Sequence, residues 1–466
     1  MNAVVQADAL AAYSAAFETM QARTGPVAAR ATAFARFAEL GFPGERDEAW
    51  KYTSLRRLAG RRFQVATAGI APSATVVPSP LADHRILMFN GEVAPDASPT
   101  AAPPAGLRVR TLAEAIRDGE APGALLRVAA DGGTGRFTAL NSALCPDALV
   151  IDVESGARST PALQVTLLAS GETGQMSHPR IRIRAAAGSE ARIVLHHVGD
   201  DATERFVNAF VDVEVGSDAV LHLYRLQTQG AKAFQIERID ATIGQRGLLV
   251  VHDAQLGGSL ARLDLHARLA APGAAAELTG LFLADGTRHL DTHVRVDHLA
   301  PGTRSLQDYR GIAAGRGRAV FNGKAVVHQG AQQSNARQSS RNLLLTPGAE
   351  IDTKPELEIY ADDVQCSHGA TTGQLDPAAV FYLRSRGLSV EEARSALTRA
   401  FVAAVLSRMD QPRFAAAVHD AFDARLARLL EATGARPRPQ PGRRRAARET
   451  WTSRQCAATS RCSAAG

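Results

Sequence analysis

Apolar and polar residues follow two rhythms along the chain. Between about residues 150 and 375, apolar residues alternate with polar ones, as at Ile181 and Ile183 and again at Leu221 and Leu223. This period of two predicts β-strands that bury one face. In the first sixty residues and again after residue 376, apolar residues recur at helical spacing instead, which predicts amphipathic helices at both ends.

A longer period lies over the strand pattern. Glycine, two residues, a small residue, one more residue and an aliphatic residue recur at spacings of 28, 28, 29 and 29 residues, beginning at Gly188, Gly216, Gly244, Gly273 and Gly302. Each glycine could supply the positive φ of a turn, and each unit has room for two strands. A constant period favours a stacked solenoid of the β-helix type over a sandwich of hairpins, whose turns recur without strict spacing.

Four segments follow from these patterns: a helical domain with a linker over 1–105, a β-helix core over 106–375, a helical domain over 376–433 and an Arg/Pro-rich disordered tail over 434–466. Residues 64–105 are rich in Ala, Pro and Ser and are expected to be irregular. Trp50 is interpreted as an aromatic packing anchor. The C-terminal helices, opened by Asp376 and by a capping box at Ser389, could cap the open end of the solenoid or bind a partner.

Charge and composition narrow the functional classes. The chain of 466 residues carries a net charge of +6, but residues 434–466 alone carry +7, so the body carries −1 and nucleic-acid binding is not expected. The 4 cysteines exclude a disulfide scaffold, and Cys456 and Cys462 lie in the tail. No secretory signal and no membrane-spanning run is found. We therefore expect a soluble cytoplasmic protein without a membrane partner.

Two kinds of motif bear on chemistry: candidate phosphate-binding loops and a candidate metal-binding triad. Lys324 is followed by Ala325 instead of the Ser or Thr of a P-loop, and residues 315–318 lack the strand–loop–helix context of a phosphate site, so this chain alone should not hydrolyse a nucleotide. On a strand, His289, Asp291 and His293 share one face, which is interpreted as a solvated strand face in preference to a metal site.

Cys366 and His368 form the sharper constellation. They are two residues apart, so on an extended chain they project to the same side. A thiolate and an imidazole are good ligands for iron and soft metals. Two ligands do not complete a site, so the alternatives are a buried cysteine beside a loop histidine, or a site whose other ligands come from another chain.

A family resemblance bears on this choice. Residues 330–336, 343–348, 354–364 and 366–371 (Cys-Ser-His-Gly-Ala-Thr) closely resemble the SufD side of the SufB/SufD family of the SUF iron–sulfur cluster assembly system, and residues 48–53 resemble its N-terminal motif. The SufB-type paralogue is the nearest alternative. It is richer in cysteine and has an acidic residue in place of Cys366.

The resemblance implies a central right-handed parallel β-helix flanked by N-terminal and C-terminal helical domains. It also implies a non-catalytic scaffold subunit of a SufBCD complex, paired with a SufB-like paralogue and a SufC-like ABC ATPase that docks on the C-terminal helices. His368 matches the position implicated in building the nascent cluster at the junction of two β-helices, with Cys366 as a second candidate metal ligand. The iron–sulfur cluster would be transient, reduced flavin could accompany the complex although no flavin motif is found, and the chain alone could form a homodimer.

Two other functions remain open at this point. Parallel solenoids can carry paired carboxylates in a groove, so a carbohydrate-active enzyme using Asp352, Asp362 and Asp363 is one alternative, although only 5% of the residues are aromatic. The other is a pure adaptor in which His368 is structural. The tail extends beyond residue 433, near which family members normally end.

Overall fold

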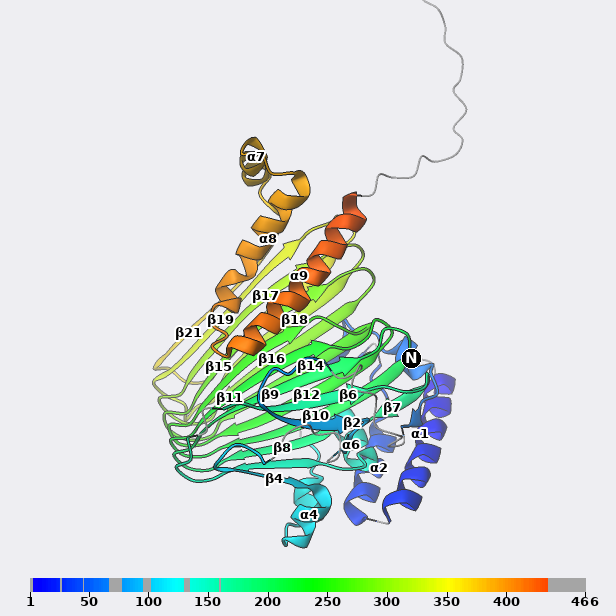
Figure 1. Ribbon diagram of the computed structural model, residues 1–466. Helices are drawn as coiled ribbons and strands as arrows, with labels where there is room; N and C mark the ends of the chain where they lie inside the picture. Colours follow the sequence, from blue (N-terminus) through cyan, green and yellow to red (C-terminus); the bar gives the residue numbers. More distant parts are fainter. Residues whose placement is uncertain are drawn as a thin grey trace, which may run out of the picture.

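The chain forms a β-helix that is flanked by helices, as Figure 1 shows. The computed structural model describes residues 3–25, 27–44, 46–66, 78–94, 102–129, 135–158 and 161–434. Successive strands alternate between two sheets, and each strand of the β-helix pairs in parallel with the strand one turn earlier, as in Phe206 with Phe234. The predicted fold class, mainly β with a central solenoid and helical ends, is confirmed.

Within the described residues, sheet A has eleven strands and sheet B has ten. Sheet A contains β4 (Leu107–Thr111), β5 (Leu149–Val153), β8 (Arg180–Ala185), β10 (Arg205–Val215), β12 (Phe234–Ile243), β14 (Leu260–Leu269), β16 (His289–His298), β18 (Arg318–Val327) and β20 (Glu350–Ile359), with β1 (Gln64–Val65) and β7 (Gln175–Ser177) beside them. Sheet B contains β3 (Glu92–Val93), β2 (His84–Phe89), β6 (Leu163–Ala169), β9 (Glu190–Gly199), β11 (Val220–Thr228), β13 (Leu248–Gln255), β15 (Ala275–Ala284), β17 (Arg304–Ala313), β19 (Ser334–Leu344) and β21 (Val364–Gly373).

The main core lies between the two sheets. Alternate residues of each strand point inward, and the parallel register stacks them in columns such as Leu221, Leu249 and Ala276. Small and branched aliphatic residues dominate these columns because each must fit between its neighbours one turn above and below.

The glycine period marks the turns, but in two different ways. Gly188, Gly273 and Gly302 have the predicted positive φ. In the two turns of the solenoid that follow Gly188, the positive φ falls on Asp218 and Arg246 instead of on Gly216 and Gly244. The alignment predicted from the glycines is therefore two residues out of register in these turns. Gly216 and Gly244 serve close packing, since a Cβ on Gly216 would lie 2.9 Å from the Ala185 carbonyl oxygen.

Helices of the N-terminal half cover the outer face of sheet A. These elements are α1 (Ala3–Thr24), α2 (Ala28–Leu40), the 3-10 turn η1 (Glu48–Trp50), α3 (Arg56–Ala59), α4 (Leu112–Arg117), α5 (Pro122–Leu125) and α6 (Gly135–Leu144). Trp50 and Phe137, with ring centroids 5.4 Å apart, belong to an aromatic cluster that also holds Phe206 and Phe234 of the sheet. The expectation that Trp50 is a packing anchor is confirmed.

The segment predicted to be irregular over 64–105 contains the strands β1, β2 and β3, so that prediction is wrong for these three elements. β2 pairs in parallel with β6, and β1 pairs with β7. The physical reason is the short apolar run at the end of β2, where Leu87, Met88 and Phe89 are buried against the solenoid. Because the surrounding residues are mostly Ala, Pro and Ser, the composition of the whole segment does not reveal this short apolar run. Residues 67–77 and 95–101 lie outside the described part of the chain.

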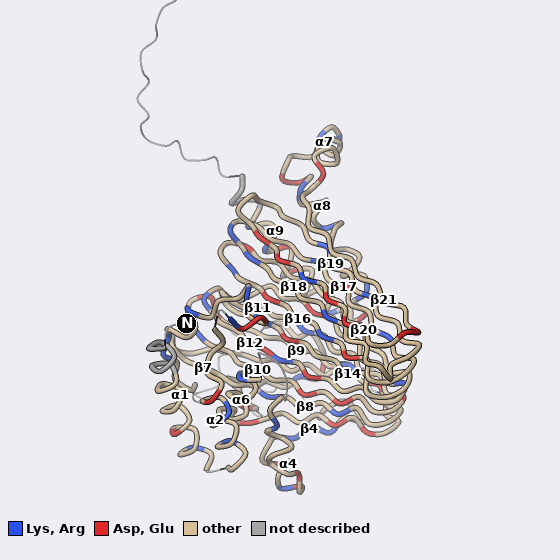
Figure 2. The backbone as a smooth tube through the Cα atoms, turned by 180° about the vertical axis from the view of Figure 1, so that it is seen from behind, with Lys and Arg blue, Asp and Glu red and all other residues tan. Residues whose placement is uncertain are grey.

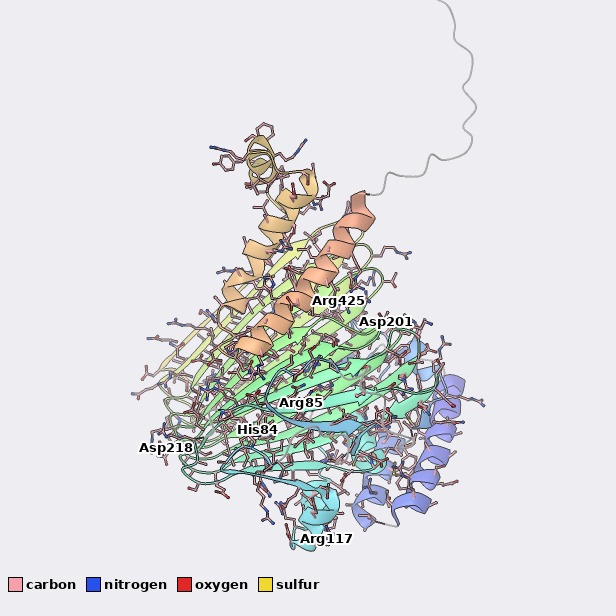
Figure 3. The ribbon with its side chains drawn as sticks, viewed as in Figure 1. His84, Arg85, Arg117, Asp201, Asp218 and Arg425 are labelled. Atoms are coloured by element: carbon pink, nitrogen blue, oxygen red, sulfur yellow. The ribbon has the colours of Figure 1, made fainter. Side chains whose placement is uncertain are left out.

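The C-terminal helices are α7 (Pro377–Ser385), α8 (Val390–Leu406) and α9 (Pro412–Gly434). Figures 1 and 2 show α8 and α9 running across the outer face of sheet B, where their apolar residues pack beside Tyr224 and Leu281. Arg425 of α9, labelled in Figure 3, also forms an ion pair with Asp285, which lies 3.2 Å away. Of the two predicted roles, capping the open end of the solenoid is therefore wrong for these helices.

Helix α7 projects away from the body and has no buried residue. The predicted tail lies outside the described residues apart from Gly434, the last residue of α9. Across the described helices, none combines the length and apolar character needed to cross a membrane.

Candidate functional site at the open end of the solenoid

The last turn of the β-helix has no neighbour on one side within the described chain. β20 ends sheet A and β21 ends sheet B, each hydrogen-bonded to only one strand. The opposite end is closed differently, because β4 and β3 pair there in antiparallel orientation with β5 and β2. Figure 2 shows β20 and β21 along one border of the molecule. The last turn therefore presents the free edges of two ten-residue parallel strands, whereas the shorter antiparallel strands β4 and β3 border the opposite end.

Cys366 and His368 both lie on β21, at this open end. The register pairs Cys366 with Ala336 and His368 with Gln338 on β19, and both columns run along the interior of the solenoid. Cys366 is half-buried and His368 is exposed. The prediction that the two side chains project to one side of a strand is confirmed, and the alternative of a loop histidine is wrong, since His368 is a strand residue.

The two candidate ligands differ in their electrostatics. Burial raises the pKa of the Cys366 thiol above its ordinary value, and a hydrogen bond with the Ala336 backbone opposes this in part. The thiolate, which is the form that binds metal, is therefore disfavoured in the isolated chain. Among the described residues, no three His, Cys, Asp or Glu side chains are grouped closely enough to hold a metal ion. Cys366 and His368 therefore find no third ligand within the described residues.

The triad of His289, Asp291 and His293 was predicted to lie on a solvated strand face, and this is wrong. The three residues do share one face of β16, but the segment around Trp50 covers it and Asp291 is fully buried. Thr53 donates a hydrogen bond to Asp291 over 2.6 Å, and Arg262 donates another over 2.9 Å. Donors within the protein therefore satisfy the Asp291 carboxylate, so the triad is a structural feature that fastens the segment around Trp50 to sheet A.

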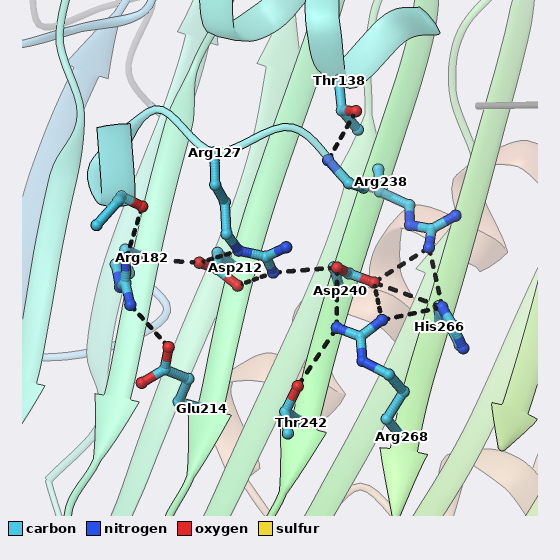
Figure 4. A network of polar contacts seen from close by, with 12 residues as sticks. Arg127, Thr138, Arg182, Asp212, Glu214, Arg238, Asp240, Thr242, His266 and Arg268 are labelled. Carbon is cyan, nitrogen blue, oxygen red and sulfur yellow. Dashed lines mark hydrogen bonds and ion pairs between the residues drawn. The ribbon is translucent and has the colours of Figure 1, made fainter. Parts of the chain in front are cut away.

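The same outer face of sheet A carries a ladder of arginines and aspartates (Figure 4). Asp240 accepts hydrogen bonds from Arg127, Arg238 and Arg268 at 3.0 to 3.1 Å. Burial alone would raise the pKa of Asp240, but these guanidinium groups reverse the shift and hold it well below its ordinary value. The ladder joins successive turns of the solenoid on its outer face, far from a strand edge.

A second charged network lies inside the solenoid, and sequence analysis missed it. Arg225 of β11 donates to Asp253 over 2.6 Å and to Glu237 over 2.9 Å, and Glu237 lies 3.1 Å from His197. All four side chains are buried. The only available signal was the polar character of Arg225 and Asp253 at inward positions one turn apart.

The remaining motifs have structural explanations. Residues 315–317 form a turn between β17 and β18, and Arg318 begins β18, so no helix follows and the phosphate-site interpretation is excluded. Asp352 lies near the start of β20, while Asp362 and Asp363 follow its end. Seven residues separate Asp352 from the end of the strand, about 23 Å at the rise of a β-strand. Glycoside hydrolysis needs carboxylates about 5 to 9.5 Å apart.

Family models match most of the chain. The model described as the SufBD core domain of the SUF system for FeS cluster assembly matches residues 167–401, and the model of the SufBD protein N-terminal region matches residues 8–165. The chain belongs to the SufBD family. The family, and the strand length between Asp352 and the other two aspartates, favour the SUF assembly function over the carbohydrate-active alternative.

Curated relatives place this SufBD chain on the SufD side. It is 30% identical over 367 residues to the iron–sulfur cluster assembly protein SufD of Escherichia coli K12, with 78% of this chain and 84% of that protein covered. It is 30% identical over 383 residues to a SufBD family protein of Synechocystis, with 79% and 84% covered. A SufBD family protein of Mycobacterium leprae is 28% identical over 382 residues, with 80% and 87% covered. The predicted resemblance to SufD is confirmed.

Proposed function

We propose that this SufBD chain is a scaffold subunit that pairs edge to edge with a SufB-like paralogue, so that His368 contributes to the site where the nascent iron–sulfur cluster is built. One observation carries the proposal. The family's histidine position lies exposed on β21, in the last turn of the solenoid, where both strands have a free edge.

The free edges favour a solenoid partner. β20 and β21 are ten residues long each, and unpaired backbone N–H and C=O groups on edges of this length tend to pair with another strand. Inward residues of the last turn, among them Ile351 and Leu357, are only partly buried, and Tyr360 is 62% exposed. A partner's first turn would cover these apolar surfaces and continue both sheets.

The ligand chemistry favours a shared site. Iron–sulfur clusters are commonly held by four cysteine or histidine ligands, and this chain offers His368 and the less available Cys366. The missing ligands would come from the paralogue across the junction. In this arrangement the chain holds and orients the cluster, which is its cargo, and performs no catalytic turnover of its own. The association of reduced flavin with the complex stays a prediction.

The central test replaces His368 by alanine in the chain co-expressed with its SufB-like and SufC-like partners. The complex is expected to form as before, because the strand edges are unchanged, while its iron and acid-labile sulfide content falls by about tenfold or more, the effect of losing about 1.4 kcal/mol of metal–ligand free energy. Metal and sulfide analysis after anaerobic purification measures this.

His84→Ala is the matched control, since His84 lies on β2 near the closed end (Figure 3). The complex that contains the His84→Ala chain should have the same cluster content as the complex with the unchanged chain. Full cluster content in the His368→Ala complex would contradict the proposed role and leave the chain a pure adaptor. A chain that forms only homodimers, and none with the paralogue, would contradict the pairing.

Helix α7 is the surface we assign to the ATPase. Phe381 and Tyr382 are 71% and 57% exposed on it, and Phe381 borders a hollow of about 520 Å³ that α7 and α8 form with the ends of the last strands. Exposed aromatic side chains beside a groove are typical of protein interfaces. Phe381 and Tyr382 lie on α7, which projects away from the part of α8 and α9 that packs on sheet B.

Replacing Phe381 and Tyr382 together by serine is expected to weaken ATPase binding by about a thousandfold, because each aromatic anchor of an interface contributes about 2 kcal/mol. Isothermal titration of the purified ATPase into the chain measures the affinity. Ile116→Ser is the control, since Ile116 is an exposed apolar residue on α4 at the other end of the molecule. Equal affinities for the double variant and the control would rule out docking on α7.

A further inference from the structure

One inward column of sheet B changes from apolar to polar as it approaches the open end. Successive strands contribute to it the residues Ile193, Leu223, Val251, Leu278, Gln307, Gln338 and His368. The first four belong to the apolar core. Gln307 and Gln338 are buried as well, and His368 above them is exposed. Two buried amides therefore stack directly beneath the candidate ligand.

Hydrogen bonds fix the orientation of both amides. The Gln307 side-chain nitrogen donates to the Lys324 carbonyl over 3.2 Å, and the Gln338 nitrogen donates to the Glu356 carbonyl over 3.3 Å. Lys324 and Glu356 are register partners, so the same bridge across the interior is repeated one turn later. Because a nitrogen must face each carbonyl, the Oε1 atoms face elsewhere.

Both of these Oε1 atoms are buried and have no hydrogen-bond partner within the described part of the chain. An unpaired buried acceptor is costly, so a donor is expected nearby. Gln307 does not supply one to Gln338: one N–H of its NH₂ group is bonded to the Lys324 carbonyl, and the second makes no hydrogen bond to the Gln338 Oε1 in the structure. The other neighbour of Gln338 in the column is His368, about 4.8 Å away between strand backbones, and its ring makes no hydrogen bond to any described residue.

We propose that the exposed imidazole of His368 turns toward Gln338, so that the Gln338 Oε1 accepts a hydrogen bond from one ring N–H and Gln338 acts as a positioning residue. A neutral imidazole has one N–H and one nitrogen lone pair, so this contact would select a single tautomer and leave the other nitrogen as the metal ligand at the open end. Histidines that bind metals are commonly oriented by such a second hydrogen bond. The consequence for the cluster rests on the proposed function, whereas the contact itself does not.

The contact is tested by NMR on the full-length chain labelled with ¹⁵N-histidine, at a pH of about 8.5, where imidazole is neutral. The His368→Ala chain identifies the His368 signals. Gln338→Met keeps the side-chain volume and removes the acceptor, and it should change the tautomer ratio of His368 by about tenfold, the effect of losing one hydrogen bond of ordinary strength. Gln338→Glu retains an acceptor oxygen and should restore the unchanged ratio.

Gln307→Met is the matched control, because it removes the same amide one turn deeper, where no imidazole lies above it. A tautomer ratio that is the same in the Gln338→Met and Gln307→Met chains would overturn the proposal, whatever His368 does in the complex. In the complex, Gln338→Met should lower cluster content several-fold and Gln307→Met should not. If His368→Ala leaves cluster content unchanged while Gln338→Met still changes the tautomer, the contact is supported and the proposed cluster role fails.

Discussion

Replacing Arg225 by leucine is expected to lower the free energy of unfolding by about 3 to 5 kcal/mol, the cost of breaking a buried ion pair by removing one partner. Arg225 is fully buried between the sheets and bonds both Glu237 and Asp253. Without its guanidinium group, the two carboxylates stay in the interior and lose their arginine partner. Urea denaturation followed by circular dichroism measures the loss.

The control is Arg246→Leu, since Arg246 pairs with Asp218 at a solvent-exposed turn of the same solenoid (Figure 3). Exposed ion pairs contribute little, so this variant should unfold almost like the unchanged chain. Adding Glu237→Gln and Asp253→Asn to Arg225→Leu should recover part of the loss, because the unpaired charges are removed. Equal unfolding midpoints for Arg225→Leu and Arg246→Leu would show that the interior network does not stabilise the fold.

Replacing Trp50 by alanine is the second large effect, with an expected loss of about 3 to 5 kcal/mol from the cavity that remains. The indole is almost fully buried against Phe137, and the Arg262 guanidinium lies 3.8 Å from its ring centre. Arg262 also donates to the Ala49 carbonyl over 2.6 Å, so losing the ring loosens the cover over Asp291. Thermal denaturation and limited proteolysis around residues 46–66 report the two consequences.

Tyr52→Ala is the comparison for this prediction, since Tyr52 is two residues away and 41% exposed. It should change neither the unfolding midpoint nor the rate of proteolysis appreciably. Trp50→Ala behaving like Tyr52→Ala would contradict the role of Trp50 in fastening the N-terminal segment to sheet A.

Much of the fold could be predicted from the sequence because its signals are local. Alternation between apolar and polar residues indicated the strands, and the glycine period indicated their stacking. The period failed at Gly216 and Gly244, where the positive φ falls on Asp218 and Arg246. A glycine that avoids a collision with the next turn looks the same in sequence as one that allows a left-handed conformation.

The candidate site was predicted only in part. The two-residue spacing of Cys366 and His368 correctly placed them on one side of a strand. The same rule placed His289, Asp291 and His293 on one face, but it wrongly left that face to solvent. Period-two reasoning assigns a residue to a face and contains no information about what packs on that face, which here is a segment more than two hundred residues earlier in the chain.

By itself, the sequence determined the strands, the repeat, the flanking helices and the family, since each is written in neighbouring residues or in short motifs. The tertiary structure alone decided which strands lack a neighbour, that α8 and α9 lie beside the solenoid instead of closing it, and that Gln338 lies beneath His368. The physical reason is the register of the β-helix. It brings residues about thirty positions apart into direct contact, and only a complete set of strand pairings shows where the stack ends.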